Sequence, residues 1–390
     1  MFSRRISLFS LFGFDVKIDV SWLLLAALIS WTLAEGVFPE LTPGLTASVY
    51  WWMAVAVTIG LLLSIVFHET AHSLVARRFG ISIRGITLFV FGGVAEMEGE
   101  PRSARSEFLM AVAGPIFSLL LAAVFFLLVA LVGRFNMPDA VAGVFWYLGY
   151  ANAILALFNL VPAFPLDGGR MLRAGLWAWR GDIVWATRIA AAAGDLFGLL
   201  LIVFGAVEIL RGNFVGGLWQ ILIGTFLRGA AAMAYQQTVA QRIFANLQIG
   251  QIMSQNPIAV PPNISVAEFI DAYIYRHHHR AFPVVRDGVV VGVIGTQQVA
   301  ALNQSQWPTA SVDQAMAPYG DADIIAPELP ALDALAKMSS SSRGRLYVLK
   351  DGKLIGVVSL RDLVEILAAH LELSGDLGGA NTLLRASPMR

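Results

Sequence analysis

The chain has 390 residues, of which 57% are hydrophobic and 14% are charged, and its mean hydropathy is +0.68. Soluble domains contain about 45–50% apolar and about 25% charged residues. The composition therefore excludes a disordered chain and argues against a purely soluble protein. The 27 basic and 27 acidic residues cancel, which argues against nucleic acid as a partner. Because the sequence has no cysteine, a metal site would need histidine and carboxylate ligands.

Six apolar runs of about 20 residues, the length that crosses a bilayer, lie at 20–38, 48–76, 107–132, 141–162, 184–210 and 214–236. The amino-terminal segment looks like a cleavable signal, but Asp15, Lys17 and Asp19 interrupt it, so we expect a retained anchor. Arginines concentrate in the loops after the second, fourth and sixth runs, and basic loops face the cytoplasm. We expect a multi-pass protein of the cell (inner or plasma) membrane, with its amino terminus and carboxyl region cytoplasmic.

The carboxyl region contains two copies of one pattern, at 251–305 and 311–370. Each copy has a short leading strand, an amphipathic helix, two β-rich runs around an Asp-Gly turn, and a closing helix. A repeat of about 60 residues in only two copies predicts paired soluble α/β modules rather than a solenoid. We expect 1–236 to form the membrane domain, 237–250 a linker, and 371–390 a mobile tail.

A His-Glu-x-x-His motif ends the second apolar run, with His68, Glu69 and His72. Two histidines four residues apart share one helix face, with Cβ atoms about 5–6 Å apart, which suits two corners of a zinc tetrahedron. Glu69 lies beside them, where it can take a proton from a metal-activated water. Such polar groups are costly at membrane depth unless they serve a function, which favours a catalytic site over a chance match.

The third ligand has to be a carboxylate, because the membrane region has no other histidine. Asp167 is the best candidate, since it follows the fourth run in a segment broken by proline and glycine, and irregular backbone at this depth lines cavities. Two spans separate His72 from Asp167, so both should lie at the same membrane face. Asp195 and Glu96 are the competing carboxylates.

Two long motifs resemble the site-2 protease family of intramembrane zinc metalloproteases: HETAH at 68–72 and NLVPAFPLDGGR at 159–170, supported by GGVAEMEGEP at 92–101 and AGPIFS at 113–118. The resemblance implies zinc ligands at His68, His72 and Asp167, with Glu69 as catalytic base. It also implies that Asn159 steadies the tetrahedral intermediate. A membrane-dipping β-hairpin at 85–98 would offer an edge strand to the substrate, through Gly92, Gly93, Val94 and Ala95.

The carboxyl repeats resemble a pair of cystathionine-β-synthase (CBS) domains, which often sense adenine nucleotides. Gly356-Val-Val-Ser359-Leu-Arg-Asp362 fits the family signature that places the aspartate on the ribose. The first copy departs from it: Thr296 is retained, but Val299 stands where the aspartate belongs. The resemblance implies one adenine-nucleotide site at Ser359 and Asp362; a structural or dimerising module is the equal alternative. For His277, His278 and His279, a solvated turn is favoured over a metal site.

These observations predict a polytopic α-helical membrane protein of about six transmembrane helices with a short membrane-associated β-hairpin, followed by a soluble α/β CBS-domain pair. The expected activity is zinc-dependent cleavage of a membrane-anchored protein, for example an anti-sigma factor or another membrane-tethered regulator, under control of the CBS pair. We expect a homodimer through the CBS domains as a further possibility, and no nucleic acid. The alternatives are a CBS-regulated channel or transporter and a catalytically silent scaffold. A conduction pathway would spread polar residues over several spans, whereas here they gather at one face.

Overall fold

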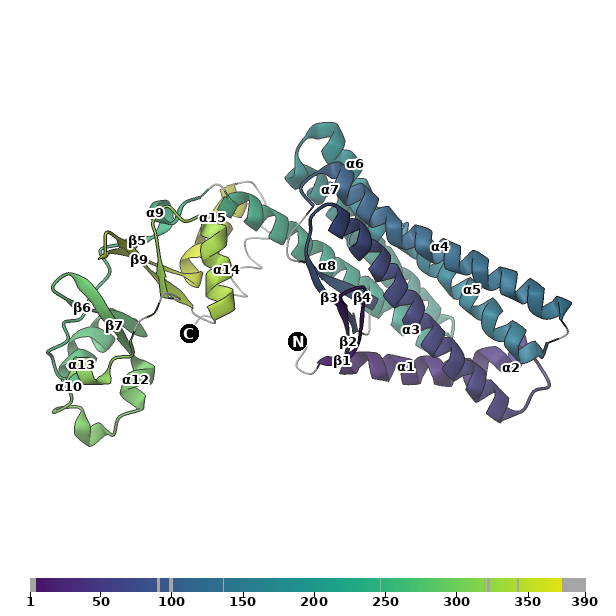
Figure 1. The fold of residues 1–390 in the computed structure, drawn as a ribbon, viewed down its shortest axis with the longest axis horizontal. Helices are drawn as coiled ribbons and strands as arrows, with labels where there is room; N and C mark the ends of the chain where they lie inside the picture. The colour runs from purple at the N-terminus through teal and green to yellow at the C-terminus, as the bar shows by residue number, and fades with distance from the viewer. Residues whose placement is uncertain are drawn as a thin grey trace. The chain divides into compact units, whose positions relative to one another are not determined.

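The computed structural model describes residues 5–89, 92–97, 101–135, 137–245, 247–318, 320, 323–341 and 344–373. The chain divides into two compact units, Met1–Tyr235 and Gln236–Arg390. Figure 1 shows the helical bundle of the first unit and the smaller α/β fold of the second, and each is described by itself. Of the expected mobile tail at 371–390, residues 371–373 belong to the last helix, and 374–390 lie outside the described residues.

Six helices of the described residues are long and apolar enough to cross a membrane, which confirms the six predicted spans. The first, Val20–Leu41, consists of α1 (Val20–Thr32), a π-helical turn η1 (Leu33–Val37) and α2 (Phe38–Leu41). The others are α3 (Ala47–Arg78), α4 (Ala104–Arg134), α5 (Asp139–Asn159), α7 (Ile183–Leu210) and α8 (Phe214–Ala245). Because α8 continues to Ala245, much of the expected linker at 237–250 is helical.

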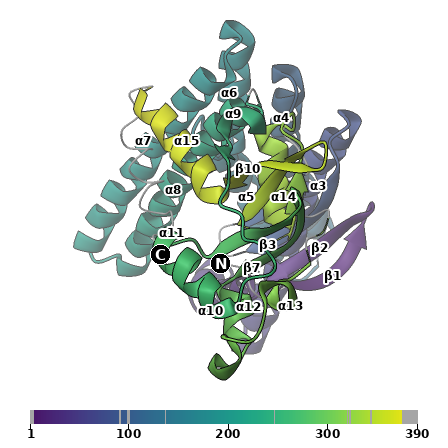
Figure 2. The same cartoon turned by 90° about the vertical axis from the view of Figure 1, so that its left-hand side faces the viewer.

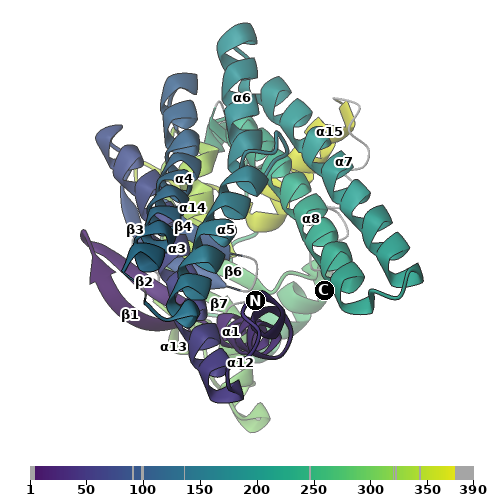
Figure 3. The same cartoon turned by 90° about the vertical axis from the view of Figure 1, so that its right-hand side faces the viewer.

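Glycines bring the helices of the bundle close together. A Cβ on Gly198 of α7 would stand 2.7 Å from the carbonyl oxygen of Gly224 in α8, and one on Gly205 would stand 2.5 Å from that of Gly217. Small residues allow such backbone approach between membrane helices. Figure 3 shows α7 and α8 running side by side as a result.

A four-stranded sheet accompanies the bundle, in the order β1 (Arg5–Leu11), β2 (Phe14–Asp19), β3 (Ile83–Phe89), β4 (Gly92–Met97). The expected hairpin at 85–98 corresponds to β3 and β4, which pair antiparallel; Glu98 lies outside the described residues. Strand β2 joins this hairpin by parallel pairing with β3, and Figure 2 shows β2 beside β1, with which it pairs antiparallel. Strand β4 is therefore an edge strand of the sheet.

The amino-terminal hairpin, β1 and β2, was not predicted. Phe14, Val16 and Ile18 alternate and are buried, and the latter two pack with Val66 of α3, two residues before His68. The turn between the strands has positive φ at Phe12 (50°) and Gly13 (82°), as a two-residue hairpin turn requires. The hairpin thus fixes the sheet against the helix that carries the His-Glu-x-x-His motif.

The second unit contains one sheet, in the order β6-β7-β10-β9-β8, with β5 also paired to β10. Positive φ at Asp287 and Gly288, and again at Asp351 and Gly352, confirms the two Asp-Gly turns. The strands are β5 (Ser254–Gln255), β6 (Ala281–Arg286), β7 (Val289–Gly295), β8 (Ile324–Ile325), β9 (Arg345–Lys350) and β10 (Lys353–Ser359). The helices are α9 (Ile249–Ile252), α10 (Val266–Phe269), η2 (Ile270–Ile274), α11 (Tyr275–His277), α12 (Thr296–Ala300), η3 (Gln304–Gln306), α13 (Val312–Ala315), α14 (Ala331–Ser341) and α15 (Leu360–Leu373).

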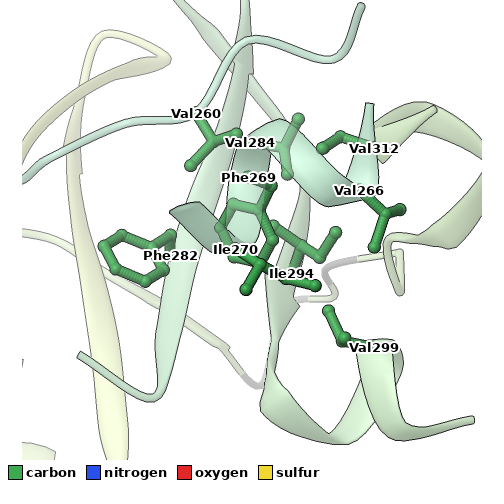
Figure 4. Packing of buried hydrophobic residues seen from close by; sticks show 9 residues of the cluster. All are labelled: Val260, Val266, Phe269, Ile270, Phe282, Val284, Ile294, Val299 and Val312. Atoms are coloured by element: carbon green, nitrogen blue, oxygen red, sulfur yellow. The ribbon is translucent and has the colours of Figure 1, made fainter. Parts of the chain in front are cut away.

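The two repeats exchange their leading segments. Strand β5 is the leading strand of the first copy but pairs with β10 of the second. Reciprocally, Ala317 at the start of the second copy exchanges two backbone hydrogen bonds of 2.9 Å with Val293 in β7 of the first. Phe269, Phe282 and Ile294 fill the core of the first copy (Figure 4). Each copy therefore completes the sheet of the other.

Candidate metal centre

Helices α3 and α6 (Asp167–Arg180) bring together His68, His72 and Asp167, and all three are buried. The two Nε2 atoms are 3.1 Å apart, and each lies 3.1 Å from Asp167 Oδ2. A tetrahedral Zn²⁺ with bonds of about 2.0–2.1 Å would hold neighbouring ligand atoms roughly 3.3 Å apart. The donor set and its spacing therefore fit a zinc ion. Within the described residues, this is the one group of three such side chains that could hold a metal.

The Nδ1 atom of each imidazole contacts helix α4, and this contact orients the ring. His72 Nδ1 lies 2.7 Å from the carbonyl oxygen of Met110, and His68 Nδ1 lies 2.9 Å from Ser118 Oγ. Because a carbonyl oxygen only accepts, His72 Nδ1 donates, which leaves Nε2 to act as a ligand. Such outer contacts fix the ring orientation of metal-binding histidines.

Gly114 of α4 lies between these two contacts, directly against the imidazoles. A Cβ at this position would stand 2.3 Å from His72 Nε2 and 2.6 Å from His68 Nε2. These distances are far below any normal contact, so the site requires glycine here. Met110, Gly114 and Ser118 are spaced by four residues and form the face of α4 that lines the centre.

Asp167 is the first residue of α6 and is held by close backbone packing. Cβ atoms on Gly168 and Gly169 would stand 2.3 Å from Leu160 O and 2.2 Å from Phe164 N. Phe164 N also donates to Ala190 O of α7 at 3.2 Å. The two glycines after Asp167 therefore let the helix start against the preceding loop.

Glu69 lies beside the edge strand β4. A Cβ on Gly93 would stand 2.7 Å from Glu69 Cγ and 3.2 Å from Glu69 Oε1. Gly92, Gly93, Val94 and Ala95, the residues expected to present the edge strand, all lie in β4 and pair with Phe89, Leu88, Thr87 and Ile86 of β3. The edge strand therefore runs past the carboxylate next to the metal-binding group.

Asn159, Asp195 and Glu96, the other polar residues considered for the site, make hydrogen bonds outside the group of three ligands. Asn159 is the last residue of α5, and its Nδ2 donates to Leu155 O at 3.0 Å. Asp195 Oδ1 accepts from Arg228 Nε at 2.6 Å. Glu96 accepts from Thr87 Oγ1 at 3.0 Å and lies 3.7 Å from Lys17 Nζ. Neither competing carboxylate belongs to the group with His68 and His72.

In the second CBS copy, Ser359 and Asp362 contact each other. The backbone nitrogen and Oγ of Ser359 donate to Asp362 Oδ2 at 2.7 and 2.8 Å. The equivalents expected in the first copy, Thr296 and Val299, are wrong by one residue. Gly295 pairs with the first residue of β6, just as Ser359 pairs with the first residue of β9. Gly295 and Gln298 therefore take the positions of Ser359 and Asp362, and the first copy lacks both the hydroxyl and the carboxylate.

The three consecutive histidines follow α11, where His278 has positive φ (54°). Partial burial, together with the charges of Arg345, His277 and His278, lowers the pKa of His279. Among the residues that the structure describes, these histidines do not form a metal-binding group.

The contacts from α4 were missed at the sequence level. The segment AGPIFS was noted for its resemblance alone, yet it contains both Gly114 and Ser118. Their spacing of four residues, matching that of His68 and His72, is the signal that could have placed them on one helix face against the histidines.

A buried His-His-carboxylate group inside a bundle of membrane-spanning helices defines the class of membrane-embedded metallohydrolases. Residues 56–144 and 135–205 match Peptidase family M50, and residues 249–301 and 312–369 match the CBS domain. Rip3 of Mycobacterium tuberculosis is 35% identical over 92% of this chain and 91% of its own length. The zinc metalloprotease MJ0392 of Methanocaldococcus jannaschii is 29% identical over 95% of this chain and 98% of its own.

Among solved structures, the site-2 protease from Methanocaldococcus jannaschii matches 59% of this chain and 94% of that chain, at 28% identity and a TM-score of 0.42. The chain belongs to peptidase family M50, the site-2 proteases, and carries CBS domains in its carboxyl region. It is a multi-pass intramembrane metalloprotease.

Proposed function

We propose that this protease holds one Zn²⁺ between His68, His72 and Asp167 and hydrolyses a peptide bond in or near a transmembrane segment of a membrane-anchored protein. The observation that carries the proposal is the buried triangle of ligand atoms, each 3.1 Å from the other two. A bound Zn²⁺ would supply Lewis-acid activation of the scissile carbonyl and of the attacking water.

The chain's own residues supply the remaining chemistry. A transmembrane helix hides its backbone in internal hydrogen bonds, so the substrate has to unwind locally, and the free edge of β4 accepts the extended segment by β-augmentation. Glu69, beside Gly93 of that strand, takes the proton from the attacking water. Asn159 turns its Nδ2 from Leu155 O toward the developing oxyanion and donates to it.

Zinc analysis of the purified protein tests the metal centre, and Asp167→Ala is the decisive variant. We expect about one zinc per chain in the wild type and a large loss in Asp167→Ala, because catalytic zinc takes three protein ligands. Asp195→Ala is the matched control and should keep its zinc, since Asp195 binds Arg228. Unchanged zinc in Asp167→Ala would assign the third ligand to another residue, and a wild type without zinc would favour a silent scaffold.

We propose further that the CBS pair regulates the protease by binding adenine nucleotide at Ser359 and Asp362. Isothermal titration calorimetry with ATP, ADP and AMP should show binding to the wild type. Asp362→Asn should weaken it by about 10- to 100-fold, since a hydrogen bond to a charged group contributes about 1.5–3 kcal/mol. Gln298→Asn, at the equivalent position of the first copy, is the control. If none of the three nucleotides gives a binding signal, the CBS pair has a structural role and the proposed regulation is wrong.

The arginine-rich loops support an orientation with the amino terminus and CBS pair in the cytoplasm of the cell membrane. We propose as substrates membrane-tethered regulators, such as anti-sigma factors, whose release acts on the cytoplasmic side. The CBS pair is also the surface through which we propose a homodimer forms.

A further inference from the structure

A buried ion pair connects α4 to α6 close to the metal centre. Glu107, in the first turn of α4, is fully buried, and Arg173 of α6 is 6% exposed. Arg173 Nε donates to Glu107 Oε1 at 2.6 Å, and Nη2 contacts the same oxygen. Among the described residues, Glu107 Oε2 has no hydrogen-bond partner. Because desolvation offsets most of the attraction in such a pair, net stability is a weak reason for its presence.

Glu107 lies on the face of α4 that orients the histidines. Met110, one turn later, accepts the hydrogen bond from His72 Nδ1 at 2.7 Å, and Ser118 contacts His68 Nδ1 at 2.9 Å. The spacing from Glu107 through Met110 and Gly114 to Ser118 keeps all four on one side of the helix. The position of α4 is therefore tied to the two imidazoles.

Arg173 belongs to the element that carries the carboxylate. Helix α6 begins at Asp167, six residues before Arg173. The guanidinium also stacks on Phe164, with Cζ 4.9 Å from the ring centroid, and Phe164 lies three residues before Asp167. Arg173 thus connects the helix that begins at Asp167 with Phe164 of the preceding loop, while its ion pair reaches α4.

We propose that the Glu107–Arg173 pair is a positioning element that fixes α6 against α4 and so sets the distance from Asp167 Oδ2 to the two imidazoles. The proposal rests on the zinc-binding role proposed above for these three residues. Zinc–oxygen bonds span only about 2.0–2.2 Å, so a small displacement of α6 removes a ligand. Outer residues that hold metal ligands typically change metal affinity by about 10–100-fold.

The test separates positioning from stability by replacing the whole pair with apolar residues. The double variant Glu107→Leu/Arg173→Met removes both charges, so the metal-free protein should unfold within a few degrees of the wild type, because apolar replacement of buried pairs is often neutral. Its zinc affinity, measured on the full-length protein by competition with a chelator, should fall about 10–100-fold. The control Asp195→Leu/Arg228→Met removes the ion pair between α7 and α8 and should bind zinc as the wild type does.

Wild-type zinc affinity in the Glu107→Leu/Arg173→Met variant would overturn the proposal. An affinity that falls only in step with the unfolding temperature, as in a generally destabilised protein, would overturn it as well. Glu107→Leu gives a second measurement: it leaves Arg173 charged and without its hydrogen-bond acceptor, and it should weaken zinc binding at least as much as the double variant. A wild type that binds no zinc would contradict the proposed function itself, which distinguishes the two failures.

Discussion

Glu69→Gln should abolish proteolysis while the protein keeps its zinc. The substitution preserves the size of the side chain and leaves His68, His72 and Asp167 unchanged, but the amide has no basic oxygen to accept a proton from water. A positioned general base contributes about 10²–10⁴-fold to rate, so we expect activity to fall by at least this factor. The measurement is cleavage of membrane-anchored proteins, compared between cells that carry the wild type or the variant, together with the zinc content of both purified proteins.

Glu35→Gln provides the control, because Glu35 lies in η1 and accepts a hydrogen bond from Trp51 Nε1 at 3.2 Å, which a glutamine oxygen also accepts. Its activity and zinc content should equal those of the wild type. Proteins that accumulate uncut only in Glu69→Gln cells are candidate substrates. Undiminished cleavage in Glu69→Gln would show that another group takes the proton and would contradict the proposed mechanism.

Gly114→Ala should weaken zinc binding without altering any of the three ligands. The added methyl would stand 2.3 Å from His72 Nε2 and 2.6 Å from His68 Nε2, in the space where these atoms converge on Asp167. Overpacking of this kind costs about 1–3 kcal/mol, which corresponds to roughly 10- to 100-fold weaker zinc binding. Zinc content and cleavage should both fall, whereas Glu69→Gln removes cleavage alone.

Gly133→Ala is a matched control on the same helix, because a Cβ at Gly133 meets nothing within 4 Å. Both variants add one methyl group to α4 and raise its helix propensity, so a difference in zinc content reports on the site. Equal zinc contents for the two variants would show that the imidazoles are not packed against α4 at Gly114.

The ligand group was predictable because two local patterns contain it. His68 and His72 share a helix face by spacing alone, and the absence of other histidines in the membrane region left a carboxylate as the third ligand. The spans and paired repeats were likewise visible, since apolar length and the Asp-Gly turns are local signals.

The features that the sequence did not predict depend on contacts between segments far apart in the chain. The hairpin β1–β2 is anchored by parallel pairing with β3, about 70 residues later in the chain, and its alternating Phe14, Val16 and Ile18 were overlooked beside stronger apolar runs. The register error at Thr296 arose because only strand pairing identifies Gly295 as the equivalent of Ser359. The Glu107–Arg173 pair joins residues 66 positions apart. The sequence around each residue does not indicate which residue it pairs with.

The exchanged leading segments of the two repeats have a consequence for how this region forms during synthesis. The first repeat leaves the ribosome before Ala317, so the backbone N–H and C=O of Val293 in β7 lack the partner they have in the folded protein until the second repeat follows. Strand β5 likewise has no pairing partner until β10, about 100 residues later in the chain, has been synthesised. Because neither half can complete its own hydrogen bonding, we expect the region to fold as one cooperative unit after translation of the second half. A truncation between the halves would therefore leave the first half with an incomplete part of the shared sheet.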